Sequence, residues 1–533
     1  MQYVSERFTD QEQQVLRPYF SNLDGPVFAL VNLPEVVKGA LFARYSRSDK
    51  SLRRLFLDEF VSSLDMTGDL TFDASTGLKR AEDLYDRVFL EYGDDSVAQL
   101  GGVHLACEQS SNILTKILEW GRLMAYLEQS TRYVPYDTRL GGRYRYLRPA
   151  EVLESPLGAL YIAEMDRAFS VYCSLLPRMV DWARERYPKE AGDSDFVYKQ
   201  STKAKACDAV RGILPAATLS NVGIYGTGQA YEALLMRMRA HPLPEARLYA
   251  DMILTELRKV VPSFLSRVDR PDRGGAWSAY FGETHEHTES VVHRIFGEEE
   301  PKPRPGVTLT DFDPEGEDKV LAAICYSHSN LPEDQLLARV RLLSADERVA
   351  LLQAYVGARS NRRHKPGRAF ERTDYRFDVL ADYGAFRDLQ RHRMLTIEWQ
   401  QLAPTHGYDV PEAVTEAGAE EEFNQALGHS AALHGAMMLR FPVQASYAVA
   451  LAYRIRFVMQ LNAREAMHLI ELRTTPQGHP AYRVVAQEMH TLIGEKAGHK
   501  AIAAAMKYAD HETYELERLA SERAAETRRK ADT

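Results

Sequence analysis

The chain has 533 residues, 45% of them hydrophobic, and a formal net charge of −9 at pH 7. Length alone predicts roughly three or four domains, and the acidic balance excludes a protein that binds polyanions over its whole surface, so we expect no nucleic-acid partner. No run of 18 apolar residues occurs and the first ten residues are polar and acidic, so we expect neither a membrane span nor a signal peptide.

The first expected elements are a short strand over residues 27–31 and a helix that begins after Pro34-Glu35. The same order returns as a strand over residues 307–312 and a helix after Pro314-Glu315. β-branched and aromatic residues mark both strands. The two helices also share their endings, Tyr45-Ser46-Arg47-Ser48 and Tyr326-Ser327-His328-Ser329. Such self-similarity is typical of an internal duplication.

Two further landmarks follow in the same order in both halves. The segment 211–215, Arg-Gly-Ile-Leu-Pro, has a looser counterpart at residues 440–442, Arg-Phe-Pro. Each is followed by a helical segment that ends in arginine, at Arg239 and at Arg473. We therefore predict a first repeat over residues 1–266, a linker over 267–305 and a second repeat over 306–533.

The predicted linker is rich in proline and mixed charge, which disfavours packed structure. It contains His285, His287 and His293, but no cysteine or fixed carboxylate geometry accompanies them, so we expect no metal. The cysteines, Cys107, Cys173, Cys207 and Cys325, lack metal-ligand spacing and lie in largely apolar surroundings. They are typical of reduced core residues in a cytoplasmic protein.

The remaining pattern favours helix. Apolar residues at helical spacing predict helices over residues 336–356, 423–438 and 447–472, and the charged tail from residue 512 predicts another. Short β-prone runs are few. The expected fold class is α+β, with two helix-rich units that each have a central mixed or antiparallel sheet.

The most informative motif is the basic triplet Arg391-His392-Arg393, followed by Glu398. Two guanidinium groups beside an imidazole repel one another unless an anionic or electron-rich group lies close. The alternative is a solvated basic turn paired with nearby carboxylates. In the first repeat the corresponding place is occupied by Trp120-Gly121-Arg122.

These residues resemble the flavin-dependent thymidylate synthases, whose Arg-His-Arg triplet is followed by seven residues, a serine and an arginine-tyrosine pair. The second repeat is similar to the family over residues 307–510: His364 precedes Phe370-Glu371, and Asn462-Ala463-Arg464 begins eleven residues before Arg473. The resemblance implies that the second repeat contacts FAD through His364, Arg387, Arg391, His392, Arg393, Asn462 and Arg464.

The two repeats depart from the family in complementary ways. The second has Gln401 in place of the serine and Ala403-Pro404 in place of the arginine-tyrosine pair. The first keeps that arm at residues 128–133, Glu-Gln-Ser-Thr-Arg-Tyr, but has lost the triplet. It also has Asp94 or Asp95 at the place of the upstream histidine and Gly228 at the place of the asparagine.

The resemblance implies reductive methylation of dUMP to dTMP, with methylenetetrahydrofolate as carbon donor, FAD as hydride carrier and NADPH as reductant. Guanidinium forks and hydroxyls suit a phosphate monoester, and the implied nucleotide ligands are Glu128, Ser130, Arg132, Tyr133 and Arg211, with Asp208 beside Arg211. The implied catalytic residues are Arg473, Arg239 and His392. A homodimer would rebuild the family's homotetramer as a pseudo-tetramer with composite sites.

Other interpretations remain open from the residues themselves. Ser130 is also typical of a turn cap, Arg132 could pair with Glu128 on one helix face, and Arg239 could be a helix C-terminal charge. The whole chain could modify another pyrimidine nucleotide, bind flavin or nucleotide as a non-catalytic regulator, or serve as a helical scaffold.

Overall fold

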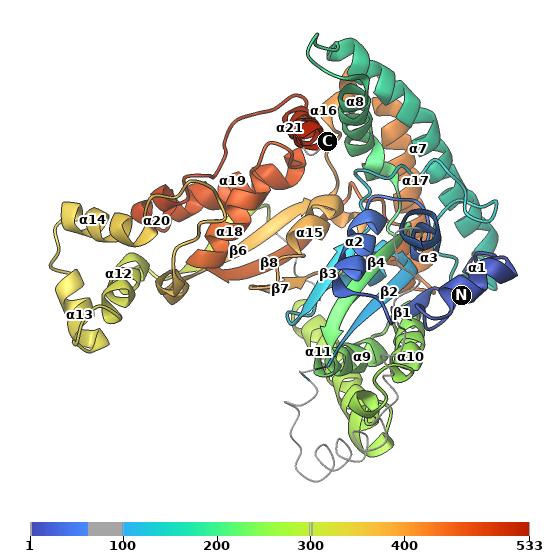
Figure 1. Cartoon of the computed structure of the whole chain (residues 1–533), viewed down its shortest axis with the longest axis horizontal. Coiled ribbons are helices and arrows are strands. Elements are labelled where there is room, and N and C mark those ends of the chain that lie inside the picture. The colour runs from blue at the N-terminus through green and yellow to red at the C-terminus, as the bar shows by residue number, and fades with distance from the viewer. Residues whose placement is uncertain (1–2, 62–98, 100, 298, 300–301, 532–533) are drawn as a thin grey trace. The chain divides into compact units, whose positions relative to one another are not determined.

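The computed structural model describes residues 3–61, 99, 101–297, 299 and 302–531 (Figure 1). The chain divides into two compact units. The first consists of Met1–Ser170, Leu214–Glu300 and Gly428–Val449, and the second of Val171–Ile213, Pro301–Leu427 and Ala450–Thr533. Each unit therefore combines most of one half of the sequence with a segment of the other half.

Each unit contains a four-stranded antiparallel sheet with the same strand order. In the first unit the order is β1 (Val27–Leu30), β2 (Gly102–Ser111), β4 (Leu219–Thr227) and β3 (Met124–Glu128). In the second it is β5 (Val307–Phe312), β6 (Asp374–Asp382), β8 (Arg454–Asn462) and β7 (Thr396–Trp399). The equal order confirms the predicted α+β class with two related units.

Helices surround the first sheet. A hydrophobic cluster that includes Phe20, Phe28, Phe42 and Phe56 packs against β1. The helices of this unit are α1 (Asp10–Leu16), α2 (Glu35–Tyr45), α3 (Leu52–Leu55), η1 (Phe56–Phe60), α5 (Asn112–Leu118), α6 (Ala150–Leu153), α9 (Gly228–Ala240), α10 (Pro244–Arg258), η6 (Ser263–Leu265), η7 (Pro271–Gly275), α11 (Ala276–Phe296) and η10 (Gln444–Ala448). Two of the boundaries between the units fall within helices, one in α7 (Gly158–Arg186) and one in α17 (Glu420–Met438).

The second unit has a similar arrangement of helices. They are α8 (Asp195–Val210), η5 (Arg211–Ile213), α12 (Gly316–Tyr326), α13 (Glu333–Val340), α14 (Ala345–Val356), η8 (Arg368–Arg372), α15 (Tyr383–Leu389), η9 (Pro404–His406), α16 (Glu412–Glu416), α18 (Ala463–Arg473), α19 (Pro480–Glu495), α20 (Lys500–Ala505) and α21 (Leu519–Ala531). Among the residues that the structure describes, no helix is long and apolar enough to cross a membrane.

Side-chain caps fix the two strand-to-helix junctions of each unit. Ser111 accepts a hydrogen bond from the Leu114 amide where β2 meets α5, and Asp382 accepts one from the Ala385 amide where β6 meets α15. Thr227 and Asn462 cap α9 and α18 in the same way. A capping oxygen satisfies an amide that the first helical turn leaves without a partner. The repeats thus share a folding device, and the structural counterpart of Asn462 is Thr227, one residue before Gly228.

Several predicted elements need correction. The segment predicted as a linker contains a helix, α11 at Ala276–Phe296, in which apolar residues recur at helical spacing and no residue is buried. The helix predicted over 447–472 is wrong: η10 and the strand β8 precede α18, since buried strands also read as apolar runs. The segment 336–356 forms two helices, separated at Ser344, which caps α14. The strand at 307–312 is confirmed.

Candidate functional site

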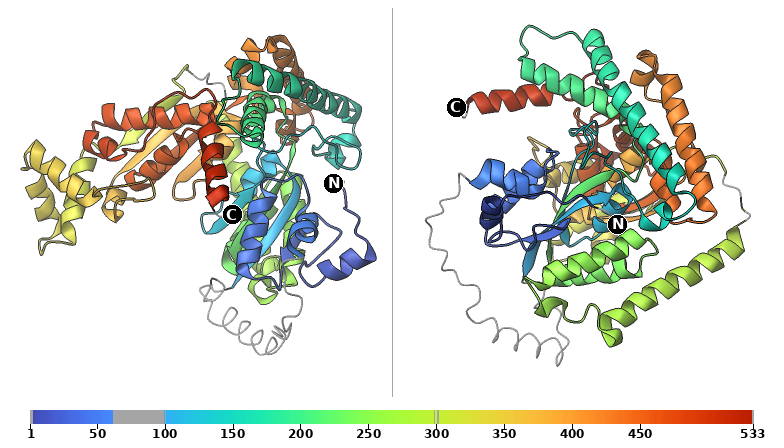
Figure 2. Two further views of the ribbon diagram at one scale, coloured as in Figure 1. Left: turned by 45° about the horizontal axis from the view of Figure 1, so that its top comes forward. Right: turned by 90° about the vertical axis from the view of Figure 1, so that its right-hand side faces the viewer.

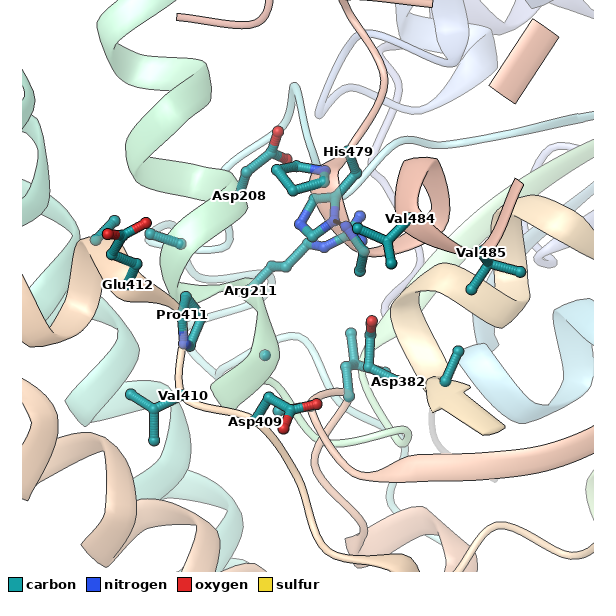
Figure 3. A pocket seen from close by; sticks show the side chains of 18 of the residues that line it. Asp208, Arg211, Asp382, Asp409, Val410, Pro411, Glu412, His479, Val484 and Val485 are labelled. Carbon is teal, nitrogen blue, oxygen red and sulfur yellow. Dashed lines mark hydrogen bonds between the residues drawn. The ribbon is translucent and has the colours of Figure 1, made fainter. Parts of the chain in front are cut away.

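A cavity of about 490 Å³ lies within the second unit (Figure 3). Asp208 and Arg211 reach it from α8 and η5, which belong to the first half of the sequence, whereas Asp382 and His479 come from the second half. The cavity is therefore composite in sequence although it lies in one compact unit. Carboxylates outnumber cationic side chains in its wall, which also contains Lys205, Asp409, Glu412, Glu416, Arg454, Glu488 and Glu517.

Arg211 and Asp382 form the polar centre of this wall. Arg211 is buried. Burial of the Asp382 carboxyl raises its pKa above the usual range, and the positive charge of the Arg211 guanidinium partly offsets that rise. Gly384 leaves room for both groups, because a Cβ there would lie 2.9 Å from Asp382 Oδ1 and 3.0 Å from Arg211 Nη2. The geometry places a cation from the first repeat beside the helix start of the second.

The position in the first unit that corresponds to Gly212 carries a large side chain, that of Tyr447. The Ala217 amide donates to the Tyr447 carbonyl in the first unit, and the Ala452 amide donates to the Gly212 carbonyl in the second. Tyr447 and Gly212 are thus equivalent. The Tyr447 hydroxyl donates to buried Glu245 at 2.6 Å, whereas Gly212 lines the open cavity. Gly212 allows a close approach to Ala452, because a Cβ there would lie 2.9 Å from Ala452 Cβ.

The triplet histidine belongs to a separate buried cluster in the same unit. Arg473 Nε donates to His392 Nε2 at 3.0 Å, so His392 carries its proton on Nδ1 and donates it to Glu465 Oε1, also at 3.0 Å. Burial lowers the pKa of His392, and hydrogen bonds from histidine hold the pKa of Glu465 below its usual range. A neutral imidazole therefore links a carboxylate to a guanidinium.

The other arginines of this region surround Asp388. Arg391 pairs with the Asp388 carboxylate, and Arg473 donates to the Asp388 carbonyl while its Nη1 lies 3.7 Å from the carboxylate. Arg387 is buried and Arg393 is exposed. The segment predicted to bind FAD thus includes buried and accessible guanidinium groups within a few residues.

The remaining residues predicted to contact FAD lie around the start of α18. Asn462 caps the helix, and Arg464 Nε donates to the Pro366 carbonyl at 3.0 Å. His364 is exposed, and its Nδ1 lies 3.3 Å from the Ser360 hydroxyl. Part of the Arg464 and Arg391 side chains stays accessible, and this donor set fits a ligand that has phosphates and ring oxygens. Both ring nitrogens of His392, in contrast, already have protein partners.

The predicted nucleotide arm of the first repeat lies in the first unit. Glu128 is buried and accepts from Lys116 at 3.1 Å, and Arg132 is also buried. Ser130 accepts from the Arg132 amide at 3.2 Å, as in a turn cap. Tyr133 is exposed, with the Arg47 guanidinium 5.4 Å from its ring centre.

The structure separates the predicted residues into two sets. Arg211 lies with the triplet, Asn462, Arg464 and Arg473 in the second unit, whereas residues 128–133 and Arg239 lie in the first. Arg239 pairs with Asp251 at 2.5 Å on a partly exposed surface. Asp94 and Asp95 lie outside the described residues.

Sequence reasoning missed several neighbours. Asp382 and His479 carry no distinctive local motif, although the capping position of Asp382 before a helix could have been noticed. Glu465 directly follows the matched segment Asn462-Ala463-Arg464, but no role was predicted for it. His392, Glu465 and His468 lie close enough to hold a cation among the described residues. The adjoining Arg473 guanidinium and the His392–Glu465 hydrogen bond account for this group without one.

Comparison with known proteins places the chain among relatives of similar length. Proteins named UPF0159 protein from Chlamydia pneumoniae and Chlamydia muridarum are 39% and 38% identical over 486 and 528 residues, covering 90% and 98% of this chain and 91% and 99% of their own. A UPF0159 protein of Thermoplasma acidophilum is 32% identical over 512 residues, which are 91% of this chain and 97% of the relative.

One solved structure, a UMP/dUMP methylase PolB from Streptomyces cacaoi bound with 5-Br dUMP, covers 37% of this chain and 94% of its own, with 18% identity and a TM-score of 0.29. A family model described as thymidylate synthase complementing protein matches residues 42–263 and again residues 308–497. The first matched segment contains strands β2, β3 and β4 of the first sheet, and the second contains β6, β7, β8 and nearly all of β5. The chain belongs to the thymidylate synthase complementing protein family, of flavin-dependent thymidylate synthases, as a tandem duplication of the family unit.

Proposed function

We propose that this protein is a flavin-dependent enzyme that methylates dUMP to dTMP at composite sites built from both repeats. Methylenetetrahydrofolate would supply the carbon and NADPH the reducing equivalents. The observation that carries the proposal is the cavity of the second unit, in which Arg211 from the first repeat faces the second repeat beside Asp382. The family match over both repeats supports the same reaction class.

In this proposal the second repeat holds FAD. Its phosphates and ring oxygens would be contacted by Arg391, Arg393, Asn462 and Arg464. The exposed His364 and the buried Arg387 would complete the FAD site. When bound, FAD supplies hydride chemistry that no side chain can provide. His392 has no free ring nitrogen, so we assign it the role of orienting Arg473, which would stabilise negative charge on the base or flavin.

Arg211 would bind the nucleotide phosphate from the cavity wall, since a guanidinium offers two parallel donors to a phosphate. Ser130, Arg132 and Tyr133, together with Glu128, would complete the nucleotide site of the same composite. Arg473 rather than Arg239 would meet the base, because Arg239 is engaged with Asp251 near the surface. We propose a homodimer, in which the four repeats form a pseudo-tetramer, and a cytoplasmic location.

A mixing experiment tests whether the arms come from different chains. Arg393→Ala in one chain and Ser130→Ala in another should each abolish turnover, and mixing the two should restore part of it if sites join two chains. If both arms lie in one chain, mixing restores nothing. A Ser130→Ala protein that binds nucleotide as tightly as the wild type would remove residues 128–133 from the site.

The acidic wall of the cavity favours one alternative substrate class. Carboxylates outnumber cationic side chains in the wall, whereas a nucleotide phosphate is bound best where cationic side chains are in excess. A pyrimidine nucleotide whose base carries an amino group is therefore the second candidate, because carboxylates can accept hydrogen bonds from that group. The same flavin chemistry would then act on a different base.

Reoxidation of the flavin discriminates these proposals. The purified protein should absorb near 450 nm, and its reduced flavin should be reoxidised anaerobically only when methylenetetrahydrofolate and a pyrimidine nucleotide are both present. Mass spectrometry of the product from dUMP, dCMP and UMP identifies the substrate. Flavin binding without reoxidation by any of them would indicate a regulator, and absence of flavin would contradict the proposal.

A further inference from the structure

Helix α11 is the most exposed regular element of the first unit. None of its residues between Ala276 and Phe296 is buried. Its contacts within the unit lie mainly on α9, where the Ser278 hydroxyl donates to the Met236 carbonyl and Gly282 approaches the Ala240 carbonyl. In the right-hand view of Figure 2 the helix extends well beyond this contact. Apart from Ser278, Gly282 and Val291, the residues of the helix are exposed.

One face of the helix carries a stripe of four apolar residues with two threonines at its centre. Residues spaced alternately by four and three positions follow it over three heptads: Trp277, Phe281, Thr284, Thr288, Val291 and Ile295. A strict heptad of this kind is the pattern of a coiled-coil seam. The helix flank that packs on α9, with Ser278 and Gly282, lies beside the stripe and leaves it uncovered.

The stripe is complementary to itself in the antiparallel sense. When two copies pair around a two-fold axis at Glu286, Trp277 meets Ile295 of the second copy, Phe281 meets Val291, and Thr284 meets Thr288. Each layer then combines a large with a smaller side chain or two threonines, which fills space evenly. Such isologous contacts are the usual way in which identical chains form closed dimers. We infer that α11 is a dimerisation helix that pairs antiparallel with α11 of a second copy of this chain.

The exposed area suffices for such a contact. The apolar side chains are 40–64% exposed in Trp277, Tyr280, Phe281, Val292, Ile295 and Phe296. Since an aromatic side chain buries about 150–250 Å², pairing would cover roughly 600 Å² in each copy. The total of ~1,200 Å² reaches the lower limit of specific protein interfaces.

Charge favours a second copy over a lipid surface. The face opposite the stripe carries Glu283, Glu286 and Glu289, whereas helices that lie on membranes carry mainly lysine and arginine on their polar face. In the antiparallel pair, Tyr280 lies beside Arg294 of the second copy, where a cation–π contact can form. The pairing does not depend on the proposed reaction, because α11 contains none of the residues assigned to it.

Cysteine crosslinking of the full chain tests the register. His285 and His287 flank the seam near the two-fold axis, whereas Glu286 lies on the outer face. His285→Cys and His287→Cys should each give a covalent dimer with a short bis-maleimide, and Glu286→Cys and the wild type should not. Equal crosslinking at all three positions, or at none, would overturn the inference.

A charge substitution tests the seam itself. Ile295→Glu in the His285→Cys protein should lower the crosslinked fraction at least about tenfold, because it buries a carboxylate against Trp277. Ser290→Glu adds the same charge to the outer face and should leave crosslinking unchanged. An Ile295→Glu protein that still crosslinks as the parent does would contradict the pairing. A wild-type protein that sediments as a monomer would contradict it as well. Flavin absorbance, measured in parallel, reports separately on the proposed function.

Discussion

Arg211 offers the sharpest test of the composite cavity. It is 4% exposed and lies beside the Asp382 carboxylate. Burial raises the pKa of Asp382, and the positive charge of Arg211 partly offsets that rise, so removal of Arg211 leaves the buried carboxylate with less compensation. Leaving a buried charge uncompensated typically costs about 3–5 kcal/mol. We therefore expect Arg211→Ala to lower the free energy of unfolding by ~3 kcal/mol or more, measured by urea denaturation.

A second substitution separates stability from ligand binding. Asp382→Asn removes the stranded charge but keeps an oxygen that can accept from the Ala385 amide. The double variant Arg211→Ala/Asp382→Asn should recover most of the lost stability, with a coupling free energy of about 2–3 kcal/mol. Its affinity for nucleotide should stay low, by about 10- to 100-fold, since a hydrogen bond to a charged group contributes ~1.5–3 kcal/mol.

The reasoning would be refuted by either of two results. If Arg211→Ala costs less than ~1 kcal/mol, Arg211 and Asp382 do not form a compensating pair. If the stable double variant binds nucleotide like the wild type, in isothermal titration against the best nucleotide, Arg211 is structural and the cavity needs another ligand. Arg239→Ala, a matched arginine substitution at a more exposed position in the first unit, is the control for non-specific effects.

Three further outcomes are expected. Gly384→Ala should destabilise the protein by about 1–2 kcal/mol and weaken nucleotide binding, because its Cβ would displace Asp382 Oδ1 and Arg211 Nη2; thermal unfolding and titration measure both. Asn462→Ala should cost ~1 kcal/mol through the lost cap, as should Thr227→Ala in the first unit, but only Asn462→Ala should release flavin on gel filtration. Burial lowers the pKa of His241 from 6.5 to about 4, so the unfolded chain binds a proton that the folded chain does not. The free energy of unfolding should therefore fall as pH drops from 6.5 toward 4, by up to ~1.4 kcal/mol per pH unit, and His241→Gln should reduce that slope.

Sequence reasoning succeeded where a motif carried its own structural constraint. The strands at residues 27–31 and 307–312 have β-branched and aromatic residues, and the duplication shows itself in matched landmarks. Asn462, Arg464 and Arg473 were predicted from the resemblance to the family, and the structure places Asn462 at the start of α18 and the two arginines within it. The fold class followed from the scarcity of β-prone runs and the abundance of helical ones.

The exchange of segments between the units could not be predicted in this way. Residues 171–213 pack with the second sheet and 428–449 with the first, and such long-range packing leaves no local pattern. The sequence motif of Arg211 was visible, but its neighbour Asp382 depends on this exchange. Likewise, the role of His392 depends on Glu465 and Arg473, which lie 73 and 81 residues away along the chain.

The apolar stripe of α11 illustrates a different failure. Proline and charge at both ends of residues 267–305 predict a linker, and they do surround the helix. Between them, apolar residues and two threonines recur with heptad spacing, which the composition averaged over the whole segment does not show. A pattern of period 3.5 over three heptads is stronger evidence than composition averaged over a longer window.

The central claim is that the second repeat alone retains the flavin arm. Binding of FAD by the apoprotein, followed by absorbance near 450 nm, tests it directly when Arg473 and Arg239, which lie in the last turns of α18 and α9, are replaced one at a time. We predict that Arg473→Ala loses FAD, because the buried link through His392 and Glu465 is broken, and that Arg239→Ala binds FAD like the wild type. Loss of FAD from Arg239→Ala with normal binding by Arg473→Ala would contradict the account.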